Sequence, residues 1–176
     1  MIAVAKCMWI FQSYPYLNED SISKSLRRVK AALAELGLED TICETAGATT
    51  AQMAADAVGC GVDQIGKSII FQIEDTDQVV LFITAGGQQV DRKKAEAIIG
   101  ETFCKADATL IRKTTGFAIG GVSPVGHKTH CPIYIDETLL KYDVIWVAAG
   151  TPNHVFSISP DLLAQKISAQ ISDFII

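Results

Sequence analysis

The segment Ser68–Thr84, SIIFQIEDTDQVVLFIT, decides the fold. Its two ends, Ser68–Ile73 and Val79–Thr84, are rich in β-branched and aromatic residues, which favour strands. The polar stretch Glu74–Asp77 between them is typical of a turn. The sequence therefore predicts a β-hairpin.

A helix, a strand and a second helix are expected before the hairpin. Apolar residues recur every three or four positions from Ser21 to Leu36, which predicts an amphipathic helix that Ser21 caps and Gly37 ends. A strand is expected at Thr41–Thr45. Thr49–Gln52 has the pattern of a capping box for a short helix that ends at Gly59.

After the hairpin, Asp91 is expected to cap a helix that runs to Ile99 and stops at Gly100. The remaining expected elements are a helix at Ala106–Arg112, a loop at Gly116–Thr129, strands at Pro132–Ile135, Val144–Ala149 and Val155–Ile158, and a terminal helix that Ser159 and Pro160 begin. Because helices and hairpins mix without regular β-α-β alternation, the sequence predicts an α/β fold of the α+β type. Its sheet should be mixed and partly antiparallel, with helices packed around it.

Length and composition indicate one globular domain. The chain has 176 residues, and we expect residues 1–20 to be an N-terminal extension and residues 21–176 to be the domain. Its apolar runs are far shorter than the roughly 20 residues of a membrane-spanning helix. The 5 cysteines are odd in number and include no C-x-x-C pair, which favours reduced thiols and a cytoplasmic protein.

The net charge of −5 argues against tight, non-specific binding of nucleic acid, because such binding needs cations that neutralise phosphates. Basic residues do cluster at Lys24–Lys30 and at Arg92–Lys94. Each cluster could be no more than a solvated helix face. Composition alone leaves nucleic acid as a weakly held partner.

The most unusual segment is Thr115–His127, TGFAIGGVSPVGH. Consecutive glycines let a ligand approach the main chain, and successive N–H groups in such a bend can bind an anion or a developing oxyanion. A purely structural turn is the alternative. Lys67, just before the expected strand, could point to solvent or supply a fixed charge for a phosphate or carboxylate.

Two other kinds of site are open. His127, His130 and Cys131 could be metal ligands, although a four-coordinate site needs one more group. Cys131 could instead pair with either histidine as a nucleophile and its base. Asp91 and Asp136 are expected to be a helix cap and a turn residue.

Five short motifs follow one another in a specific order: Gln64-Ile65-Gly66-Lys67-Ser68, Val90-Asp91-x-x-Lys94, Thr115-Gly116-x-x-Ile119-Gly120-Gly121-Val122-Ser123-Pro124-x-Gly126, Ile135-Asp136 and Ala149-Gly150. With them the chain resembles the YbaK family, also called the prolyl-tRNA synthetase-associated domain, from about Ser21 to Ile171. The resemblance implies a mixed, largely antiparallel, curved sheet surrounded by helices. It also implies trans-editing, which is hydrolysis of the ester between a wrong amino acid and tRNA.

The resemblance also implies site residues and partners. The catalytic candidates are Lys67, Gly120, Gly121, Val122 and Ser123, and the candidate substrate-binding residues are Ser68, Phe71, Pro124, Gly150 and Thr151. Further pocket walls are expected near Thr45 and Thr84. Neither a cofactor nor a metal is implied. The expected substrate is tRNA, specifically tRNA(Pro), carrying a small amino acid such as Cys, Ala or Ser, and prolyl-tRNA synthetase is a candidate partner.

One mechanism follows from these residues. Amides near Gly120 and Gly121 would hold the ester carbonyl oxygen as its charge grows, while Lys67 would hold the phosphate or ribose of the terminal adenosine. Water, or a hydroxyl or thiol of the substrate, would attack. This mechanism requires the Lys67 ammonium and the glycine-rich bend to lie on the same side of the molecule. The alternative function is a non-catalytic module that binds tRNA or a synthetase.

Overall fold

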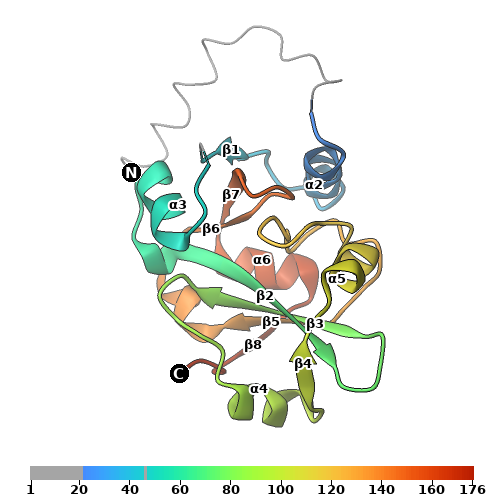
Figure 1. Cartoon of the computed structure of the whole chain (residues 1–176). Helices are drawn as coiled ribbons and strands as arrows, with labels where there is room; N and C mark the ends of the chain where they lie inside the picture. The colour runs from blue at the N-terminus through green and yellow to red at the C-terminus, as the bar shows by residue number, and fades with distance from the viewer. Residues whose placement is uncertain (1–21, 46) are drawn as a thin grey trace, which may run out of the picture.

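A mixed eight-stranded sheet forms the centre of the protein (Figure 1). The computed structural model describes residues 22–45 and 47–176. The strands lie in the order β1-β7-β6-β2-β3-β5-β8, and β4 also pairs with β2. Their bounds are β1 Cys43–Glu44, β2 Ile65–Ile73, β3 Val79–Ala85, β4 Phe103–Lys105, β5 Ile133–Asp136, β6 Ile145–Ala148, β7 His154–Ile158 and β8 Gln170–Ser172. The pairs β1–β7, β2–β3, β2–β4 and β6–β7 are antiparallel, and β2–β6, β3–β5 and β5–β8 are parallel, which confirms a mixed, α+β sheet.

The predicted hairpin is confirmed as β2 and β3, which pair antiparallel from Gln72 opposite Val79 to Gly66 opposite Ala85. However, β2 begins at Ile65, three residues earlier than predicted, because Ile65 and Gly66 also pair with β6. A side chain at Gly66 would come within 2.8 Å of Val147 Cγ1, so this close strand contact needs glycine. Lys67 therefore lies inside the strand rather than before it.

Five α-helices and two 3₁₀-helices surround the sheet in the described residues. They are α2 Lys24–Glu35, α3 Ala51–Val58, α4 Arg92–Ile99, α5 Ala108–Thr115, α6 Pro160–Ile167, η2 Val62–Gln64 and η3 Glu137–Lys141. Ser21 lies outside the described residues, and the cap of α2 is Ser23, whose Oγ accepts from Leu26 N. The capping box predicted for α3 is wrong, since Thr50 is the cap and accepts from Met53 N.

Other helix ends follow their capping residues. Asp91 caps α4 by accepting from two amides, which confirms its predicted role. Asp136, the predicted turn residue, caps the 3₁₀-helix η3 by accepting from the amide and the hydroxyl of Thr138. α5 lies two to three residues later than predicted because Asp107 caps it and Gly116, in the left-handed region, ends it. α6 begins at Pro160 as expected, but the Ser159 side chain makes no capping hydrogen bond.

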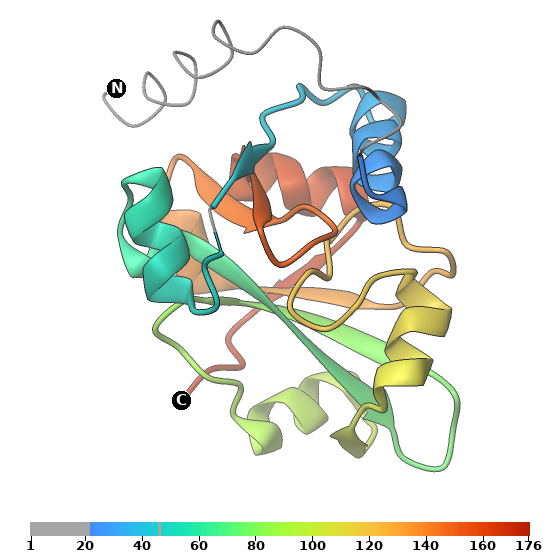
Figure 2. The ribbon, with the colours of Figure 1, turned by 45° about the horizontal axis from the view of Figure 1, so that its top comes forward.

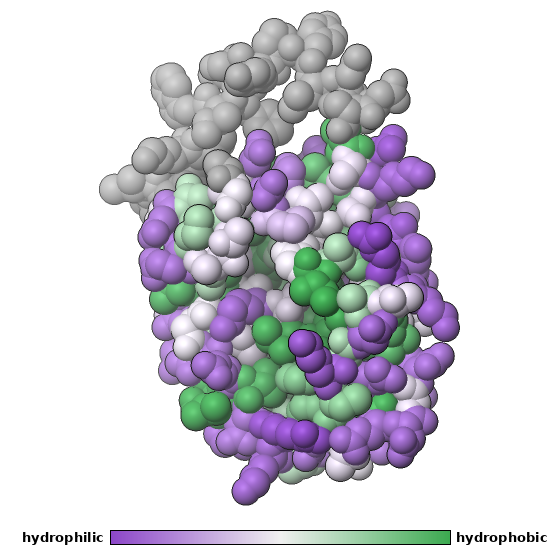
Figure 3. Space-filling model, in the orientation of Figure 1, coloured by the Kyte–Doolittle hydropathy of each residue, from purple (hydrophilic) through white to green (hydrophobic). Residues whose placement is uncertain are grey.

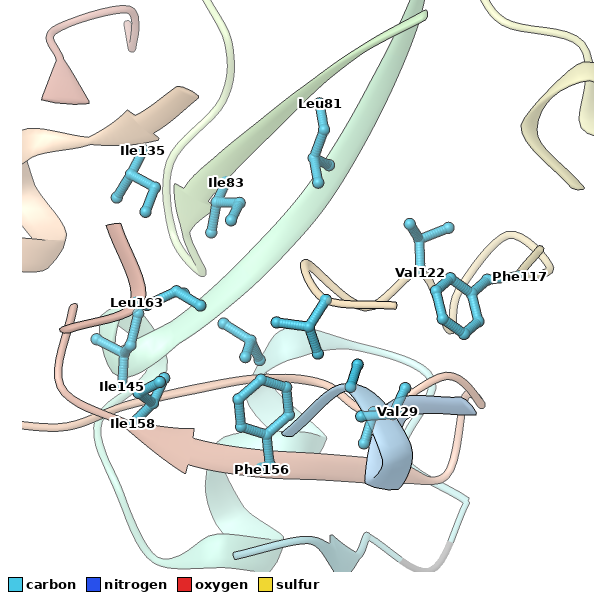
Figure 4. Packing of buried hydrophobic residues seen from close by; sticks show 14 of the residues in the cluster. Val29, Leu81, Ile83, Phe117, Val122, Ile135, Ile145, Phe156, Ile158 and Leu163 are labelled. Carbon is cyan, nitrogen blue, oxygen red and sulfur yellow. The ribbon is translucent and has the colours of Figure 1, made fainter. Parts of the chain in front are cut away.

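The described residues form three apolar cores, one on one face of the sheet and two on the other, and the smallest packs α3 against Ile65, Trp146 and Val155. One face packs against α2, the segment after α5, and α6, with Leu81, Ile83 and Val122 among its buried residues (Figure 4). The other face packs against α4 and the C-terminal segment, around Phe82, Phe103, Tyr134 and Phe174. We call these the α2 face and the α4 face; Figure 2 shows α4 apart from the other helices.

Two strands were not predicted. β4 and β8 each contain three residues, too few for an alternating pattern to show. The predicted extension at residues 1–20 lies outside the described residues, and the assignment of residues 21–176 to one domain stays a prediction. None of the described helices combines the length and the apolar character needed to span a bilayer.

Candidate active site at the open edge of β2

One edge of β2 is interrupted. β6 pairs with β2 only at Ile65 and Gly66, and β4 pairs with it only at Phe71–Ile73. Among the described residues, no strand pairs with this side of Lys67–Ile70, which we call the open edge. β6 and β7 lie near one end of β2 and β4 near the other, and the segment after α5 runs beside the middle of the strand in both ribbon views (Figures 1 and 2).

The hydrogen-bond pattern shows which main-chain groups face the open edge. Ile73 N donates to Gln78 O at 2.9 Å, so this pair is hydrogen-bonded across the hairpin. Because such pairs alternate in an antiparallel ladder, Lys67 and Ile69 direct their main-chain groups toward β3. Ser68 and Ile70 consequently present their N–H and C=O groups to the open edge. Both residues are partly exposed.

The glycine-rich segment begins with a tight turn. Gly121 N donates to Ala118 O at 3.0 Å, and Gly120 has φ +86°, the conformation that a type II turn requires at its third residue. The Gly121 N–H is therefore already used inside the loop. This corrects the expectation that it would polarise an ester carbonyl.

Other amides of the loop remain available. The N–H groups of Gly120, Val122 and Ser123 have no hydrogen-bond partner in the part of the chain that the structure describes. Val122 and Ser123 are buried, and a buried N–H without a partner costs free energy unless a ligand satisfies it. These amides are the best candidates for an oxyanion site. In the space-filling view, the side of the molecule that is seen in Figure 1 has apolar surface in its middle, surrounded by hydrophilic residues (Figure 3).

The loop is tightly packed on the turn between β6 and β7. A side chain at Gly121 would meet the main-chain N, Cα and C of Thr151 at 2.7–2.8 Å. Gly150, with φ +90°, similarly abuts Ser25 O of α2. The structure thus brings the loop together with Gly150 and Thr151, two of the candidate substrate-binding residues.

The Ser123 hydroxyl has a structural role. Ser123 is fully buried, and its Oγ accepts from Val125 N at 3.3 Å across Pro124. The same residue's carbonyl oxygen lies 2.7 Å from His127 Nε2. Ser123 is therefore held at both its side chain and its main chain, which fixes the path of the loop.

Cys131 is poorly placed to be a nucleophile. It is 3% exposed, and burial raises the pKa of its thiol to about 11, so it stays protonated near neutral pH. Its Sγ lies 3.4 Å from His127 Nδ1, and burial lowers the pKa of His127. A neutral imidazole satisfies both contacts: its Nε2–H donates a hydrogen bond to Ser123 O, and its Nδ1 accepts a hydrogen bond from the thiol of Cys131. Cys60 and Cys104 also carry free thiols.

The metal alternative lacks a ligand set. His130 is exposed and follows the loop, whereas His127 is turned toward Ser123. Within residues 22–45 and 47–176, no group of three or more His, Cys, Asp or Glu side chains is close enough to hold a metal ion.

Lys67 lies on the α4 face of β2. It stands opposite Thr84 and in phase with Ile69 and Phe71, which pack in the core of that face. Its Nζ donates to Gln88 O at 2.6 Å, and its pKa is lowered by burial, an effect that Asp63 opposes. The loop instead packs on the α2 face. The expectation that the ammonium and the bend lie on one side is therefore wrong, and they approach each other only at the strand edge.

Phe71 and Thr84 are also directed away from the loop. The Phe71 ring centroid lies 4.3 Å from that of Phe103, inside the aromatic core of the α4 face. Thr84 is completely buried on that face, and its Oγ1 has no partner. The structure does not bring either residue together with Gly120–Pro124.

Two further hydroxyls are buried without a hydrogen-bond partner, those of Thr45 and Ser68. Ser68 lies on the open edge itself, where a ligand could satisfy its Oγ. Thr45 lines a hollow of about 380 Å³ with Ala48, Met53, Asp56 and Ala57. The open edge could not be predicted from the sequence, because it depends on where β4 and β6 stop pairing with β2.

The open edge of β2 thus lies beside loop amides that have no hydrogen-bond partner in the described residues, and amides of this kind can bind a carbonyl or anionic group. The chain belongs to the family of aminoacyl-tRNA editing domains, whose model, "Aminoacyl-tRNA editing domain", matches residues 45–166. The predicted resemblance is thereby confirmed, and the chain is a hydrolase of the class that deacylates mischarged tRNA.

Relatives agree with this assignment. A solved structure described as a candidate trans-editing enzyme for prolyl-tRNA synthetase is 41% identical, with a TM-score of 0.83 over 89% of this chain and 99% of that one. EbsC of Enterococcus faecalis, a candidate Cys-tRNA(Pro)/Cys-tRNA(Cys) deacylase, is 28% identical over 125 residues, 70% of this chain and 76% of EbsC. The proline–tRNA ligase of Shouchella clausii is 29% identical over 153 residues, which are 82% of this chain but 26% of the ligase.

Proposed function

We propose that this protein hydrolyses the ester of a small, wrongly attached amino acid, such as Cys, Ala or Ser, on tRNA(Pro), and that it does so in the cytoplasm. The single observation that carries the proposed site is that an open strand edge lies beside loop amides with no hydrogen-bond partner in the described residues. The names of the relatives support the choice of tRNA(Pro), because one is described as a Cys-tRNA(Pro) deacylase and another as a trans-editing enzyme for prolyl-tRNA synthetase.

The ester binds between the open edge and the loop. The N–H groups of Gly120, Val122 and Ser123 donate to the carbonyl oxygen, and the carbonyl oxygens of Ser68 and Ile70 accept from the amino group of the substrate. The loop is held in place by close packing on the turn between β6 and β7. The residues that form this packed wall are Gly121, Pro124, Gly150 and Thr151. The Ser68 hydroxyl, which is buried without a partner, donates or accepts at the same edge.

Hydrolysis needs no covalent enzyme intermediate. Water adds to the carbonyl carbon, and the amides stabilise the oxyanion that forms. The tetrahedral intermediate then collapses, the ribose oxygen leaves and takes up a proton, and the products are the free amino acid and uncharged tRNA. Because an aminoacyl ester is already activated, positioning can supply much of the rate enhancement. If a side-chain hydroxyl or thiol of the substrate attacks first, the ribose oxygen leaves as a cyclic ester or thioester forms, and water then opens this ring to the free amino acid.

Lys67 binds the nucleotide from the other side of the strand. Its ammonium makes one hydrogen bond, to Gln88 O, and has further N–H groups to offer. The lysine holds the phosphate of the terminal adenosine next to the α4 face, while the amino acid enters on the α2 face. The ester bond then crosses the open edge, where the chemistry occurs.

Small amino acids are the substrates that need such a second check. A synthetase pocket discriminates against a missing methylene by only about 1–3 kcal/mol. Prolyl-tRNA synthetase is the proposed partner that passes on mischarged tRNA. The similarity to part of a proline–tRNA ligase supports this choice.

A panel of charged tRNAs tests the proposal. tRNA(Pro) carrying cysteine, alanine, serine or proline is incubated with the protein, and release of each amino acid is followed with time. We expect at least one of the small amino acids to be released and proline to be retained. If every ester survives, the protein is not a deacylase of tRNA(Pro), and a binding function replaces the proposal.

A further inference from the structure

The sequence contains two basic clusters, and the structure pairs most of the cations with acids in only one of them. On α4, Arg92 pairs with Glu74 at 3.1 Å and with Glu96 at 2.7 Å, and Lys94 pairs with Asp173 at 2.9 Å. Those acids pair with two of the three cations of the α4 cluster and leave Lys93 without an ion pair in the described residues. The α4 cluster is therefore largely compensated within the protein.

The cluster on α2 is different. Lys24, Arg27 and Arg28 are three and four positions apart, so they lie on one side of the helix. None of the three has a carboxylate partner in the described residues, whereas Lys30, on another side of the helix, pairs with Asp40 at 2.9 Å. The uncompensated charge is therefore confined to one strip of α2.

This strip is unfavourable for the helix itself. Like charges spaced by three or four residues repel by a few tenths of a kcal/mol per pair. The strip also starts in the first turn of α2, which holds no acidic residue, where the helix dipole favours anions over cations. Among the described residues no carboxylate offsets these two costs, although Arg28 Cζ lies 6.0 Å from the centroid of the Phe117 ring, so an external anion is a suitable partner.

A fourth cation meets the strip at the end of α5. A side chain at Gly116 would touch Arg28 Nη1 and would lie 3.2 Å from Lys128 Cε, so both side chains converge on this glycine. The carbonyl end of α5 carries a partial charge of only about −0.5, which is too little to neutralise two cations. We call Lys24, Arg27, Arg28 and Lys128 the cationic strip.

The cationic strip adjoins the proposed active site. Gly126, at the end of the loop, packs on Arg28 and Ala32, since a side chain there would lie 3.2 Å from Arg28 O and 3.3 Å from Ala32 Cβ. A hollow of about 270 Å³ lies at this junction, lined by Arg28, Ala31, Ala32, Glu35, Gly126 and His127. Figure 2 shows α2 next to this segment of the chain.

We propose that the cationic strip binds the phosphates of the tRNA acceptor stem and so guides the charged 3′ end to the open edge. This inference rests on the proposed function, because it names the surface that receives the rest of the same substrate. It also explains how a chain of net charge −5 binds RNA, since the positive potential is local and the acidic surface elsewhere repels the backbone.

The test compares two double variants with the wild type. K24Q/R27Q removes two exposed cations of the strip, and K93Q/K141Q removes two exposed lysines outside it that make no ion pair in the described residues. Each protein is assayed on charged tRNA(Pro) over a range of salt concentrations. Each is also assayed on the matching aminoacyl ester of adenosine, which has no acceptor stem.

On tRNA at low salt, K24Q/R27Q should lower kcat/KM about ten-fold or more, mainly by raising KM. The slope of log kcat/KM against the logarithm of the salt concentration should also become shallower, by roughly 0.7–0.9 per lost phosphate contact. Activity on the adenosine ester should match the wild type, as should both activities of K93Q/K141Q. A K24Q/R27Q variant with wild-type KM and salt dependence on tRNA would overturn the proposal.

Failure of the proposed function would look different. If the wild type releases no amino acid from any tRNA, binding of uncharged tRNA(Pro) to the same three proteins, measured by fluorescence anisotropy, still decides the role of the strip. Selective weakening in K24Q/R27Q supports the surface, and equal binding by all three proteins refutes it.

Discussion

His127 Nε2 lies 2.7 Å from the carbonyl oxygen of Ser123, and this contact joins the end of the glycine-rich loop to its centre. The other ring nitrogen lies 3.4 Å from the thiol of Cys131 at the start of the following strand region. His127 therefore acts as a positioning residue for the loop amides, although it does not itself face the open edge.

Replacing His127 should separate positioning from binding. We expect His127→Ala to lower kcat roughly 10- to 100-fold with a smaller change in KM, because displaced amides lose alignment with the oxyanion. Stability should fall by about 1–3 kcal/mol, since Ser123 O loses its donor. His127→Gln keeps an N–H donor and should restore most of kcat. Steady-state kinetics and denaturant unfolding measure both effects, and equal kcat values in the two variants would refute the role.

Stability should depend on pH through buried histidines. Desolvation lowers the pKa of both His127 and His154 in the folded protein. As the pH falls through about 6.5, histidines in the unfolded chain take up protons while these two resist protonation, so the unfolded state binds more protons and stability falls. Above about pH 7.5 this contribution should vanish. Unfolding of the wild type and of His127→Gln should show a smaller acid-side loss in the variant, and identical pH dependence would contradict the assignment.

The two adjacent glycines should differ in their response to alanine. Gly121→Ala places a Cβ against the Thr151 main chain, which cannot move easily, so the loop should shift and activity should fall by about 100-fold. Gly120→Ala meets only Pro152, at 3.8 Å, but must adopt φ +86°, which costs about 1–2 kcal/mol. Its main effect should be on stability. Deacylation rates of folded protein compare the two, and greater loss of activity in Gly120→Ala would exclude this packing explanation.

Lys67 tests whether the nucleotide binds at the strand edge. Lys67→Met keeps most of the apolar stem but removes the charge, and we expect kcat/KM on charged tRNA to fall roughly 100-fold. The loss should be smaller with an aminoacyl ester of adenosine, which lacks the phosphate. Lys93→Met on α4 is the matched control. Full turnover of tRNA by Lys67→Met would remove Lys67 from the site.

Phe71 should matter for stability alone. Its ring packs on Phe103 and, edge-on, on Phe82, on the face away from the loop. Phe71→Leu should therefore cost about 1–2 kcal/mol in free energy of unfolding without changing kcat/KM. A change in amino-acid preference on the charged-tRNA panel would show instead that Phe71 contacts substrate.

Much of the framework could be predicted because its signals are local. Gly37, Gly59, Gly100 and Gly116 all adopt positive φ at or beside a helix end, and the hairpin is marked by two β-rich runs around a polar turn. The glycine-rich loop was likewise identified from composition. Such features depend on neighbours within a few residues.

The sequence did not predict which face of the sheet carries each side chain of the site, because this depends on pairing between residues far apart in the chain. Because the strand was expected to begin at Ser68, the alternation of side chains between the two faces of the sheet did not assign Lys67 to either face. Extending the strand back to Ile65 puts Lys67 in phase with Ile69 and Phe71, and so on the α4 face. The signal existed in this spacing, but the pairing with β6 that defines the strand start connects residues about 80 positions apart, such as Gly66 and Val147.

The short length of the open edge also protects the protein against pairing with a strand of another molecule. At about 3.3 Å per residue, four residues offer roughly 13 Å of unpaired backbone, bracketed by β6 and β4. A strand from a second molecule finds too few consecutive partners there to start sheet growth or fibre formation. The same length accommodates a single aminoacyl unit.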